Sequence, residues 1–528
     1  MNYLKDHILK RYWYSFPVDV DAKYGTSGFR GQFNPTLKAV IFRMGILAAM
    51  RSICTNRAIG LMITASHNPH TDNGIKLIDY DGNMFNSEWE KYANAFICIK
   101  QLDEMISFIQ DIITDTDYDE SSKCPEVLIG IDNRYHSYEL STIAGLGALC
   151  LSSKIVHLNE LTTPEMHCEV AYKNETNKFK DGYAKEVGID IRDTIHILED
   201  IKKISFSSQL WIDCSNGVGG ISLTRFNRYL NDLFKLYLIN YNEGLINCEC
   251  GADYIQKNVE LPKGLKKMKD LSGKKFASLD GDADRLIYFF LNKGSSICIL
   301  DGDDLIVLFC KFLKDLITKG NIDETIHAVT TNYSNTGLFK YLQNNNIEFH
   351  TTKTGVKYLH EEAKKYNISV FFESNGHGTI LVSDEFKKSL EKYDNKYANL
   401  LKQTIKLSNQ YVGDAIRNIF LVEMILFYYD INLEEWYNLY SKYATKQGSI
   451  KINNTTKYIC NDDENRLTSP QKLQDSIDEL VKQCNNSSRA FIRPSGTEKI
   501  LRVFVESDNK ENCLHLYDEI NKLVNDFK

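Results

Sequence analysis

Short apolar runs that end in loops rich in Gly, Asp or Ser recur along the chain, and segments with helical spacing of apolar residues follow them. This alternation predicts strands and helices that together form an α/β protein. Four predicted strands run into loops with unusual polar residues, and they cover residues 58–64, 276–279, 368–372 and 489–492. Because α/β sheets place ligands at loops that follow strands, these junctions are the candidate functional sites. Their spacing suggests one such loop in each of four domains.

The pattern also predicts elements around these loops. Residues 286–291 and 500–505 continue as strands after the second and fourth loops, and residues 509–527 repeat apolar side chains at helical spacing. Residues 419–429 are the best apolar stretch of the chain, but it is too short to span a bilayer and contains Glu423, so we expect a buried helix. No internal repeat is visible.

Length and composition narrow the class of protein. A chain of 528 residues is too long for one hydrophobic core and suggests three or four domains. The net charge of −7 argues against nucleic acid or an anionic membrane as the main partner, and the N-terminal residues lack the continuous apolar region of a secretory signal. Thirteen cysteines scattered over the chain are typical of reduced thiols in a cytoplasmic compartment.

The second loop alternates three carboxylates with other residues: Asp280, Asp282 and Asp284. These side chains can converge where the chain bends at Gly281, and three oxygen ligands with room for a phosphate oxygen and water suit Mg²⁺. An EF-hand is excluded, because that pattern requires Gly where Arg285 stands and Glu where Leu291 stands. The alternative is a solvated Asp-rich turn. That alternative is favoured for residues 301–304, which precede an apolar helix and could cap it.

Ser66 stands at the tip of the first loop, next to His67 and before Pro69. Its surroundings do not match the Gly-x-Ser-x-Gly elbow, so an acyl-transfer serine is disfavoured. A serine aimed at a metal ion could instead carry a phosphoryl group. The loop by itself leaves a turn serine and a nucleophile equally open.

The fourth loop, residues 493–497, combines Arg493, two hydroxyls and a glycine whose backbone N–H can approach an anion closely. We interpret it as a phosphate-binding loop, although a β-hairpin turn fits the same geometry. Arg502, on the following strand, points to the same site or to solvent. The third loop offers the carboxylate of Glu373 and the amide of Asn375, which suit a pair of sugar hydroxyls, whereas a lone loop histidine such as His377 is more often structural.

Taken in order, these loops resemble the motifs of the α-D-phosphohexomutase superfamily. The matching stretches are residues 64–69, 280–285, 372–379 and 493–498, with weaker matches at residues 24–30, 161–164, 250–254 and 354–357. The sequence Asn375-Gly376-His377 and residues 250–254 resemble the branch that acts on N-acetylglucosamine phosphates more than the glucose and mannose branches. Ser374 departs from that branch, which often has Ala at this position.

The resemblance implies a four-domain, heart-shaped fold in which three α/β domains with mixed sheets precede a C-terminal α+β domain. We expect these domains at residues 1–175, 176–290, 291–430 and 431–528, carrying the phosphoserine, metal-binding, sugar-binding and phosphate-binding loops respectively. The resemblance also implies a mutase that moves a phosphoryl group between two positions of a small sugar phosphate, in UDP-N-acetylglucosamine biosynthesis. It would require Mg²⁺, use a hexosamine or hexose bisphosphate as primer or intermediate, and act as a cytoplasmic monomer.

By position in the motifs, the resemblance gives each site residue a role. Ser66 would be the phosphoserine and, with the three aspartates, a ligand of Mg²⁺. Lys76 matches the family's lysine near the reaction centre and is the first candidate for the general base, with His67 second. Sugar hydroxyls would contact Glu373, Ser374 and Asn375. The non-reacting phosphate would contact Arg493, Pro494, Ser495, Gly496, Thr497 and Arg502. Arg30 and Arg285 are candidate cations for the transferring group.

Three alternatives stay open. The sugar could be glucose or mannose within the same superfamily. The acidic loop alone also fits a phosphatase that forms an aspartyl phosphate. A catalytically silent paralogue would only bind sugar phosphates or a protein partner, but the presence of Ser66, the three aspartates and Arg493 disfavours it.

Overall fold

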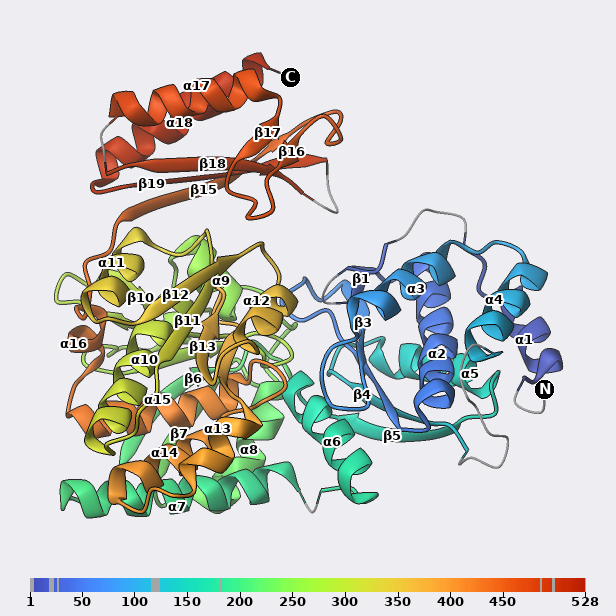
Figure 1. Cartoon of the computed structure of the whole chain (residues 1–528), viewed down its shortest axis with the longest axis horizontal. Helices are drawn as coiled ribbons and strands as arrows, with labels where there is room; N and C mark the ends of the chain where they lie inside the picture. The colour runs from blue at the N-terminus through green and yellow to red at the C-terminus, as the bar shows by residue number, and fades with distance from the viewer. Residues whose placement is uncertain are drawn as a thin grey trace.

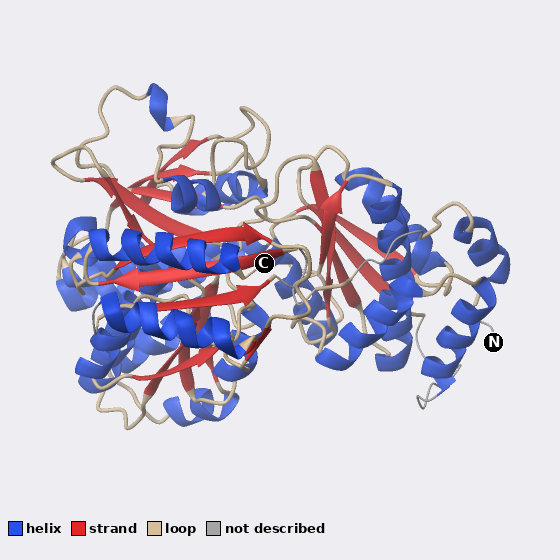
Figure 2. Cartoon of the chain, turned by 90° about the horizontal axis from the view of Figure 1, so that it is seen from above, coloured by secondary structure: helices blue, strands red, loops and turns tan. Residues whose placement is uncertain are grey.

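The computed structural model describes residues 4–18, 23–25, 28–114, 124–180, 182–484, 487–495 and 499–527. These residues form three bodies in space, in which the N-terminal body lies beside a larger central body and the C-terminal residues lie above the central one (Figure 1). Seen from above, helices lie against the strands of the bodies (Figure 2). Within the described residues, no helix is both long and apolar enough to cross a membrane.

The first sheet has the strand order β1-β3-β2-β4-β5. Strand β3 runs antiparallel to β1 and β2, whereas β2, β4 and β5 are parallel. Helices α2 and α5 cover one face and α6 covers the other, which explains why every residue of β2 is buried. The strands are β1 (Phe29–Gln32), β2 (Ile59–Ile63), β3 (Asp72–Ile78), β4 (Glu126–Ile131) and β5 (Lys154–Glu160). The helices are α1 (Asp6–Trp13), α2 (Pro35–Thr55), α3 (Ser87–Cys98), α4 (Leu102–Thr114), α5 (Ser137–Leu149) and α6 (Thr163–Thr176).

The second sheet has the order β10-β9-β8-β6-β7, with helix α8 on one face and α9 on the other. Its strands are β6 (Ser208–Asp213), β7 (Phe234–Ile239), β8 (Phe276–Leu279), β9 (Leu286–Leu291) and β10 (Ile297–Leu300). Its helices are α7 (Tyr183–Lys202), α8 (Val218–Leu230), α9 (Ala252–Asn258) and the short 3-10 helix η1 (Leu265–Lys267).

The third sheet has the order β12-β11-β13-β14, with α10 on one face and α12 on the other. Its strands are β11 (Ile326–Thr331), β12 (Glu348–Thr352), β13 (Ile368–Phe372) and β14 (Gly378–Val382). The helices of this part are α10 (Gly302–Lys319), α11 (Thr336–Asn344), α12 (Val356–Ala363), α13 (Asp384–Leu390), α14 (Lys396–Leu407), α15 (Ala415–Tyr429) and α16 (Leu433–Tyr437).

The second and third sheets share one continuous hydrophobic core. Leu210 of β6, Val370 of β13 and Ile419 of α15 belong to the same cluster of buried side chains, and α14 and α15 pack on α7. The first sheet and the C-terminal sheet have cores of their own. Helix α16 still packs on the shared core through Trp436, although it follows residue 431, so the residue boundaries of the four domains stay a prediction.

The C-terminal sheet is antiparallel with the order β15-β19-β18, and α17 and α18 pack on it. A two-stranded sheet of β16 and β17 lies beside it. The elements are β15 (Ala444–Lys451), β16 (Ile459–Cys460), β17 (Leu467–Ser469), α17 (Gln471–Cys484), β18 (Arg489–Pro494), β19 (Ile500–Ser507) and α18 (Lys510–Asp526). Arg489 of β18 donates to the carbonyl oxygens of Asn332 and Ser334, which attaches this body to the loop after β11.

The first three sheets contain the same arrangement of four strands: a hairpin of two antiparallel strands, then two strands parallel to its inner strand. Each candidate loop of the sequence connects the two strands of such a hairpin, β2–β3, β8–β9 or β13–β14, and the fourth connects β18 and β19. The structure therefore repeats a unit that no repeat in the sequence reveals.

The fold class predicted from the sequence is confirmed. All four predicted loop strands are present, and the predicted buried helix at residues 419–429 is the end of α15. Asp301 caps α10 through a reciprocal capping box with Asp304, as expected for a structural Asp-rich turn. All thirteen cysteines lie in the described residues, and no disulfide joins any of them.

Candidate active site

Ser66 lies in the loop between β2 and β3, and its side chain is buried. Its hydroxyl donates a hydrogen bond to Asp280 Oδ2 at 2.6 Å, although 214 residues separate the two in the chain. The backbone of Ser66 has a φ of +51°, a left-handed conformation that costs roughly 1–2 kcal/mol for a residue with a Cβ atom. Its N–H donates to Thr64 Oγ1 at 3.0 Å. The surrounding structure must therefore hold this loop in place.

Arg134, which follows β4, binds the Ser66 loop through its backbone. The residue is only 3% exposed, and its guanidinium donates hydrogen bonds of 2.6–3.1 Å to the carbonyl oxygens of Ser66, Asn68, Pro69 and Asp72. Its Nε also donates to Asp132 Oδ2 at 2.9 Å, so the buried charge is paired. Five hydrogen-bonding groups therefore converge on one guanidinium, and they fix the loop relative to β4.

Two residues of the second sheet's loops approach the Ser66 carbonyl from the other side. Asn247 Nδ2 donates to the carbonyl oxygens of Ser66 and Asn68 at 2.7 and 2.8 Å. A Cβ atom at Gly281 would lie 2.6 Å from the Ser66 carbonyl oxygen, so only glycine allows the two loops to come this close. These contacts set the distance between the Ser66 loop and the acidic loop.

Asp280, Asp282 and Asp284 lie in the loop between β8 and β9, and all three are buried. Each offers one carboxylate oxygen that lies within 4.8 Å of those of the other two. Asp280 Oδ1 accepts the backbone N–H groups of Asp284 and Arg285, both at 3.1 Å, so the loop closes on its own first carboxylate. The convergence predicted for the three side chains is present.

Lys76 of β3 reaches from the first sheet to this cluster. Its Nζ donates to Asp282 Oδ2 at 2.7 Å and to Asp284 Oδ2 at 2.8 Å. Thr163, at the start of α6, donates from Oγ1 to Asp282 Oδ2 at 2.7 Å, and its N–H donates to the Asp282 carbonyl at 3.1 Å. Strand β3 and helix α6 of the first body therefore meet the acidic loop of the central body, as the Ser66 loop does.

The three carboxylates fit a hard divalent cation. Asp282 Oδ1 is buried and has no hydrogen-bond partner, which is costly for a carboxylate unless a cation takes that position. Buried carboxylate oxygens from three side chains, beside a serine hydroxyl, are the donor set that Mg²⁺ prefers.

Burial and mutual repulsion shift these acids in opposite directions. Burial raises the pKa of Asp280 well above its ordinary value, and the charges of Asp284 and Asp282 raise it further. Burial also acts on Asp284, but the charges of Lys76, His377 and Arg285 outweigh it and hold the pKa well below the ordinary range. The pKa of Asp282 is lowered, because Lys76 and Thr163 outweigh burial and the charge of Asp284. Burial opposes the ammonium of Lys76, yet the two carboxylates beside it leave its pKa raised.

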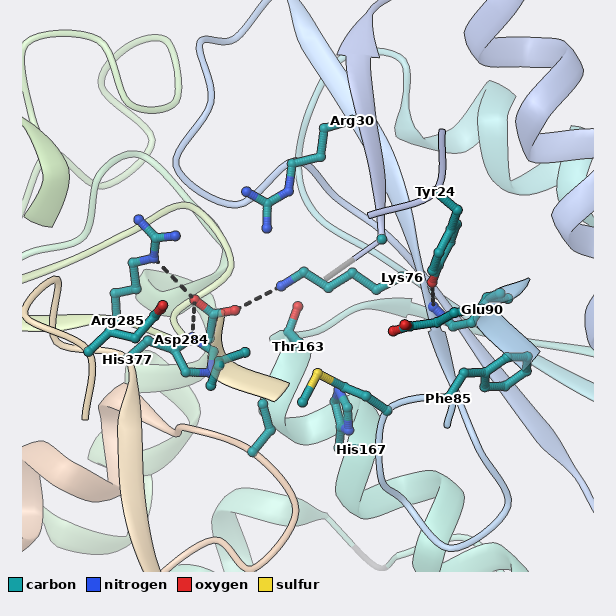
Figure 3. A pocket seen from close by; sticks show the side chains of 16 residues that line it. Tyr24, Arg30, Lys76, Phe85, Glu90, Thr163, His167, Asp284, Arg285 and His377 are labelled. Atoms are coloured by element: carbon teal, nitrogen blue, oxygen red, sulfur yellow. Dashed lines mark hydrogen bonds and ion pairs between the residues drawn. The ribbon is translucent and has the colours of Figure 1, made fainter. Parts of the chain in front are cut away.

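Three cationic side chains lie around Asp284 and come from different elements: Arg30 from β1, Lys76 from β3 and Arg285 from the acidic loop (Figure 3). Arg30 Nη1 lies 3.4 Å from His67 Nδ1, and that nitrogen lies 3.4 Å from Ser66 Oγ. Burial, together with the charges of Arg285 and Arg30, lowers the pKa of His67 well below its ordinary value, which keeps the imidazole neutral. Such a group of cations suits a dianionic phosphoryl group.

The third loop is joined to the acidic loop. Arg285 and His377 form an isolated antiparallel β-bridge, and His377 Nδ1 lies 3.2 Å from Asp284 Oδ1. Asn375 donates from Nδ2 to Glu373 at 3.2 Å and accepts the N–H of His377 at 3.0 Å. The Ser374 hydroxyl is buried and has no hydrogen-bond partner.

One pocket collects residues from the first three sheets. It is lined by Tyr24, Gly28, Arg30, Lys76, Leu77, Met84, Phe85, Glu90, Thr163, His167, Asp284, Arg285, Val356, Glu373, His377 and Val412. Across this pocket, Lys357 of α12 forms an ion pair of 2.8 Å with Glu90 of α3. The first and central bodies therefore face each other over a common space.

The fourth loop lies on the C-terminal sheet, and its described residues do not line this pocket. Arg493 and Arg502 pair directly across β18 and β19, so both side chains leave the same face of the sheet. Arg493 Nε donates to Tyr333 at 3.0 Å, and Nη1 lies 3.2 Å from Glu464. Pro494 ends β18, Ser495 is buried and Arg502 is exposed, whereas Gly496 and Thr497 lie outside the described residues.

Sequence reasoning missed the residues that hold the site together. Arg134, Asn247 and Thr163 contact Ser66 or Asp282 directly, and His167 lines the pocket. The signal available was position: Arg134 follows the end of an apolar strand, as Ser66 does, and Thr163 lies in one of the weaker family matches.

Known families match most of the chain. Residues 183–287 and 301–431 match the models for domains II and III of phosphoacetylglucosamine mutase AMG1. Residues 46–97 match the α/β/α domain I of phosphoglucomutase/phosphomannomutase, and residues 456–523 match the C-terminal domain of that group.

Full-length relatives and solved structures agree with these matches. The chain is 34% identical to phosphoacetylglucosamine mutase of Sus scrofa, over 96% of this chain and 94% of the relative. It is 33% identical to phosphoacetylglucosamine mutase 1 of Schizosaccharomyces pombe, over 95% and 98%. The crystal structure of N-acetylglucosamine-phosphate mutase in its substrate complex superimposes with a TM-score of 0.92 at 33% identity, covering 98% of this chain and 99% of that one.

A second structure, Aspergillus fumigatus N-acetylphosphoglucosamine mutase with GlcNAc-6P and magnesium, gives a TM-score of 0.88 at 31% identity, covering 96% of this chain and 95% of that one. A structure of that enzyme with glucose 1,6-bisphosphate gives 0.90 at 30% identity, covering 98% and 97%. Since identity above 30% extends over nearly the whole length of such relatives, the chain belongs to the phosphoacetylglucosamine mutase family of the α-D-phosphohexomutase superfamily.

Proposed function

We propose that this chain interconverts N-acetylglucosamine 6-phosphate and N-acetylglucosamine 1-phosphate, the step that supplies N-acetylglucosamine 1-phosphate for UDP-N-acetylglucosamine. The observation that carries the proposal is the 2.6 Å hydrogen bond from Ser66 Oγ to Asp280, which places a strained serine against a buried acidic cluster. One family relative has been crystallised in its substrate complex, and another with GlcNAc-6P and magnesium. Membership of this family also disfavours the glucose or mannose branch and a silent paralogue.

The reaction would begin from phosphorylated Ser66. The bond between phosphorus and Ser66 Oγ breaks while a new one forms to the free hydroxyl of the sugar monophosphate, which gives a bisphosphate and the free serine. The bisphosphate turns over, and its other phosphoryl group returns to Ser66. Arg30 and Arg285 offset the charge of the transferring group, since phosphoryl transfer depends on positioning and charge neutralisation.

Asp280, Asp282 and Asp284, together with an oxygen of the Ser66 ester, would hold Mg²⁺. When bound, the ion supplies further neutralisation of phosphate charge. Asp280 is placed for this role because it already contacts Ser66 Oγ. Thr163 and Lys76 orient Asp282 through the hydrogen bonds described above.

Lys76 and His67 remain the candidates to accept the proton of the attacking hydroxyl. Lys76 lines the pocket, but its Nζ donates to two of the acids and its pKa is raised, so it would have to lose a proton before it could act as the base. His67 is neutral, and its Nδ1 lies 3.4 Å from Ser66 Oγ. Replacing each by a neutral side chain, Lys76→Met and His67→Gln, separates them: the base is the residue whose loss removes the fall of kcat/KM toward low pH, where a general base is protonated.

The third and fourth loops would supply the remaining contacts to the substrate. Glu373, Ser374 and Asn375 would bind sugar hydroxyls, which is supported by the pocket position of Glu373 and by the unpartnered Ser374 hydroxyl. Arg493, Pro494, Ser495, Gly496, Thr497 and Arg502 would bind the phosphate that does not react. The paired positions of Arg493 and Arg502 support this role, because two like charges opposite each other favour an anion between them. The C-terminal body would close over the pocket to exclude water.

We also infer a monomer in the cytoplasm. One chain supplies the serine, the acids and the cations of the pocket, which supports activity without a partner subunit. The thirteen cysteines, none of which forms a disulfide in the described residues, support a reducing compartment. Light scattering of the purified protein and fractionation of cells test these two points.

The decisive experiment maps phosphate on the purified protein by mass spectrometry and measures mutase activity after priming with glucose 1,6-bisphosphate. Ser66→Ala should abolish mutase activity, whereas Ser476→Ala, which changes a partly exposed serine of α17, should leave it unchanged. If the enzyme instead releases phosphate, and Ser66→Ala does not change the rate of that release, the protein is an aspartyl-phosphate phosphatase. Comparing turnover of N-acetylglucosamine, glucose and mannose phosphates tests the sugar, and preference for either hexose would overturn that part.

A further inference from the structure

A second group of metal-binding side chains lies on the third sheet, away from the active site. His327 is near the start of β11, and Glu348 and His350 are on the neighbouring strand β12 (Figure 1). His327 pairs in register with Ser369 of β13, whereas Glu373 follows the other end of that strand. Four residues of strand separate the two positions, or roughly 13 Å at the usual rise.

The distances within this group fit one metal ion. His327 Nδ1 lies 3.2 Å from His350 Nε2 and 3.4 Å from Glu348 Oε2, and the three ligand atoms all lie within 4.8 Å of one another. Zinc bound at about 2.0–2.1 Å in a tetrahedron requires neighbouring ligand atoms about 3.3 Å apart. Both measured distances from His327 agree with that edge. The parallel pairing explains the arrangement, because Glu348 is opposite His327 and His350 is two residues further on the same face.

Tyr366 holds both imidazoles in place. Its ring stacks on His327 with centroids 4.0 Å apart and planes inclined by 11°, and on His350 at 4.5 Å and 16°. The Tyr366 hydroxyl in turn donates to Glu362 at 2.7 Å. Ordered ligands lose little rotamer freedom when a metal binds, so this platform favours binding.

The local charge also favours a cation. Glu348 lies next to the pair, and the charges of Glu324 and Glu362 act on His327 and His350 respectively. The alternative is a hydrogen bond in which the two rings share one proton, and a metal ion would replace that proton.

We propose that His327, Glu348 and His350 form a second metal site that binds Zn²⁺, with water as the fourth ligand. Two imidazoles and one carboxylate are the donors of a zinc site, whereas Mg²⁺ prefers oxygen ligands only. The ion would link β12, the edge strand of the third sheet, to β11. Because a ligand that binds only the folded state stabilises it, the melting temperature should rise with Zn²⁺ concentration.

The test uses the full chain with MgCl₂ in excess, and it measures Zn²⁺ binding by calorimetry and Co²⁺ binding by visible absorption. His350→Phe removes a ligand nitrogen but keeps an aromatic ring to stack on Tyr366, and His327→Gln removes the central ligand. His196→Gln is the matched control, because His196 is an exposed histidine 3.9 Å from a single carboxylate, that of Glu199. The acidic triad and the thiols are the same in all these proteins, so a difference between them isolates the proposed site.

We expect one equivalent of Zn²⁺ to bind at least about tenfold more weakly to the His350 and His327 variants. The loss of a hydrogen-bond partner of a metal ligand already lowers metal affinity by that factor, and these variants lose a ligand itself. The control should bind like the wild type. The difference between the Co²⁺ spectra of the wild type and the variants should show the bands of tetrahedral Co²⁺ and no thiolate band. Equal Zn²⁺ binding by the wild type and the His350→Phe variant would overturn the proposed site. A thiolate band in the difference spectrum would overturn it too, because cysteines would then be the ligands. Both readouts are independent of mutase activity.

Discussion

Arg134 offers the sharpest test of how Ser66, the proposed nucleophile, is held in position. The change Arg134→Met keeps an unbranched apolar stem but removes the guanidinium that binds four carbonyl oxygens of the Ser66 loop and the carboxylate of Asp132. Removing one partner of a buried ion pair costs about 3–5 kcal/mol, because the other charge stays buried without compensation. The loop also loses its main anchor, and a displacement of the nucleophile by about 1 Å can cost about 100-fold in rate.

Stability and positioning can be separated with a second change. In the double variant Arg134→Met/Asp132→Asn no buried carboxylate is left unpaired, so we expect part of the stability to return while kcat stays about 100-fold low. Urea unfolding gives the free energy, and steady-state assays give kcat and KM. Arg192→Met is the control, because Arg192 forms an exposed pair with Asp232 and its loss should cost no more than about 1 kcal/mol.

Arg134 does not anchor the Ser66 loop if the Arg134→Met variant unfolds at the same urea concentration as the wild type. The catalytic part of the prediction fails if the double variant regains full kcat, since that result would mean that Ser66 keeps its position without the guanidinium.

Two further predictions concern the close approach of the loops and a buried histidine. Gly281→Ala should lower kcat by roughly 100-fold, because its Cβ would lie 2.6 Å from the Ser66 carbonyl oxygen. Gly294→Ala is the control and should leave kcat unchanged, because the nearest atom to its Cβ would lie at 3.4 Å. Equal kcat values for the two variants would refute the importance of the contact at Gly281. Burial lowers the pKa of His360 from 6.5 to about 3, so below pH 6.5 the unfolded chain binds a proton that the folded chain does not, and stability falls as the pH falls. Between pH 6.5 and 5 this loss of unfolding free energy amounts to roughly 2 kcal/mol. In urea titrations, His360→Gln should remove the loss, whereas His196→Gln should not. Parallel plots of unfolding free energy against pH for the wild type and His360→Gln would show that His360 is not its source.

The sequence predicts local features of this protein well. The strand at residues 276–279 has the predicted bounds, because an apolar run between polar loops leaves few alternatives, and Asp301 caps a helix because its neighbours supply the capping partner. The three aspartates converge as expected, since their spacing in a short hairpin loop places their side chains together.

Contacts between distant segments lie beyond such reasoning. Lys76 is visible in the sequence near Ser66, but its bonds to Asp282 and Asp284 depend on how two bodies meet. Arg134 resembles any surface cation after a strand until the Ser66 loop folds over it. The common core of the second and third sheets is likewise invisible, because apolar residues in a helix do not indicate which sheet they will cover.

The hairpin that recurs in the first three sheets has a consequence for the history of the enzyme. If one ancestral unit was duplicated, its turn specialised three times: once for the proposed nucleophile, once for the acids proposed to hold a cation, and once for the groups proposed to recognise a sugar. Each copy could change its turn without disturbing the strands beneath it. Selection for a new substrate would then act mainly on the third turn, while the chemistry in the other two stayed fixed.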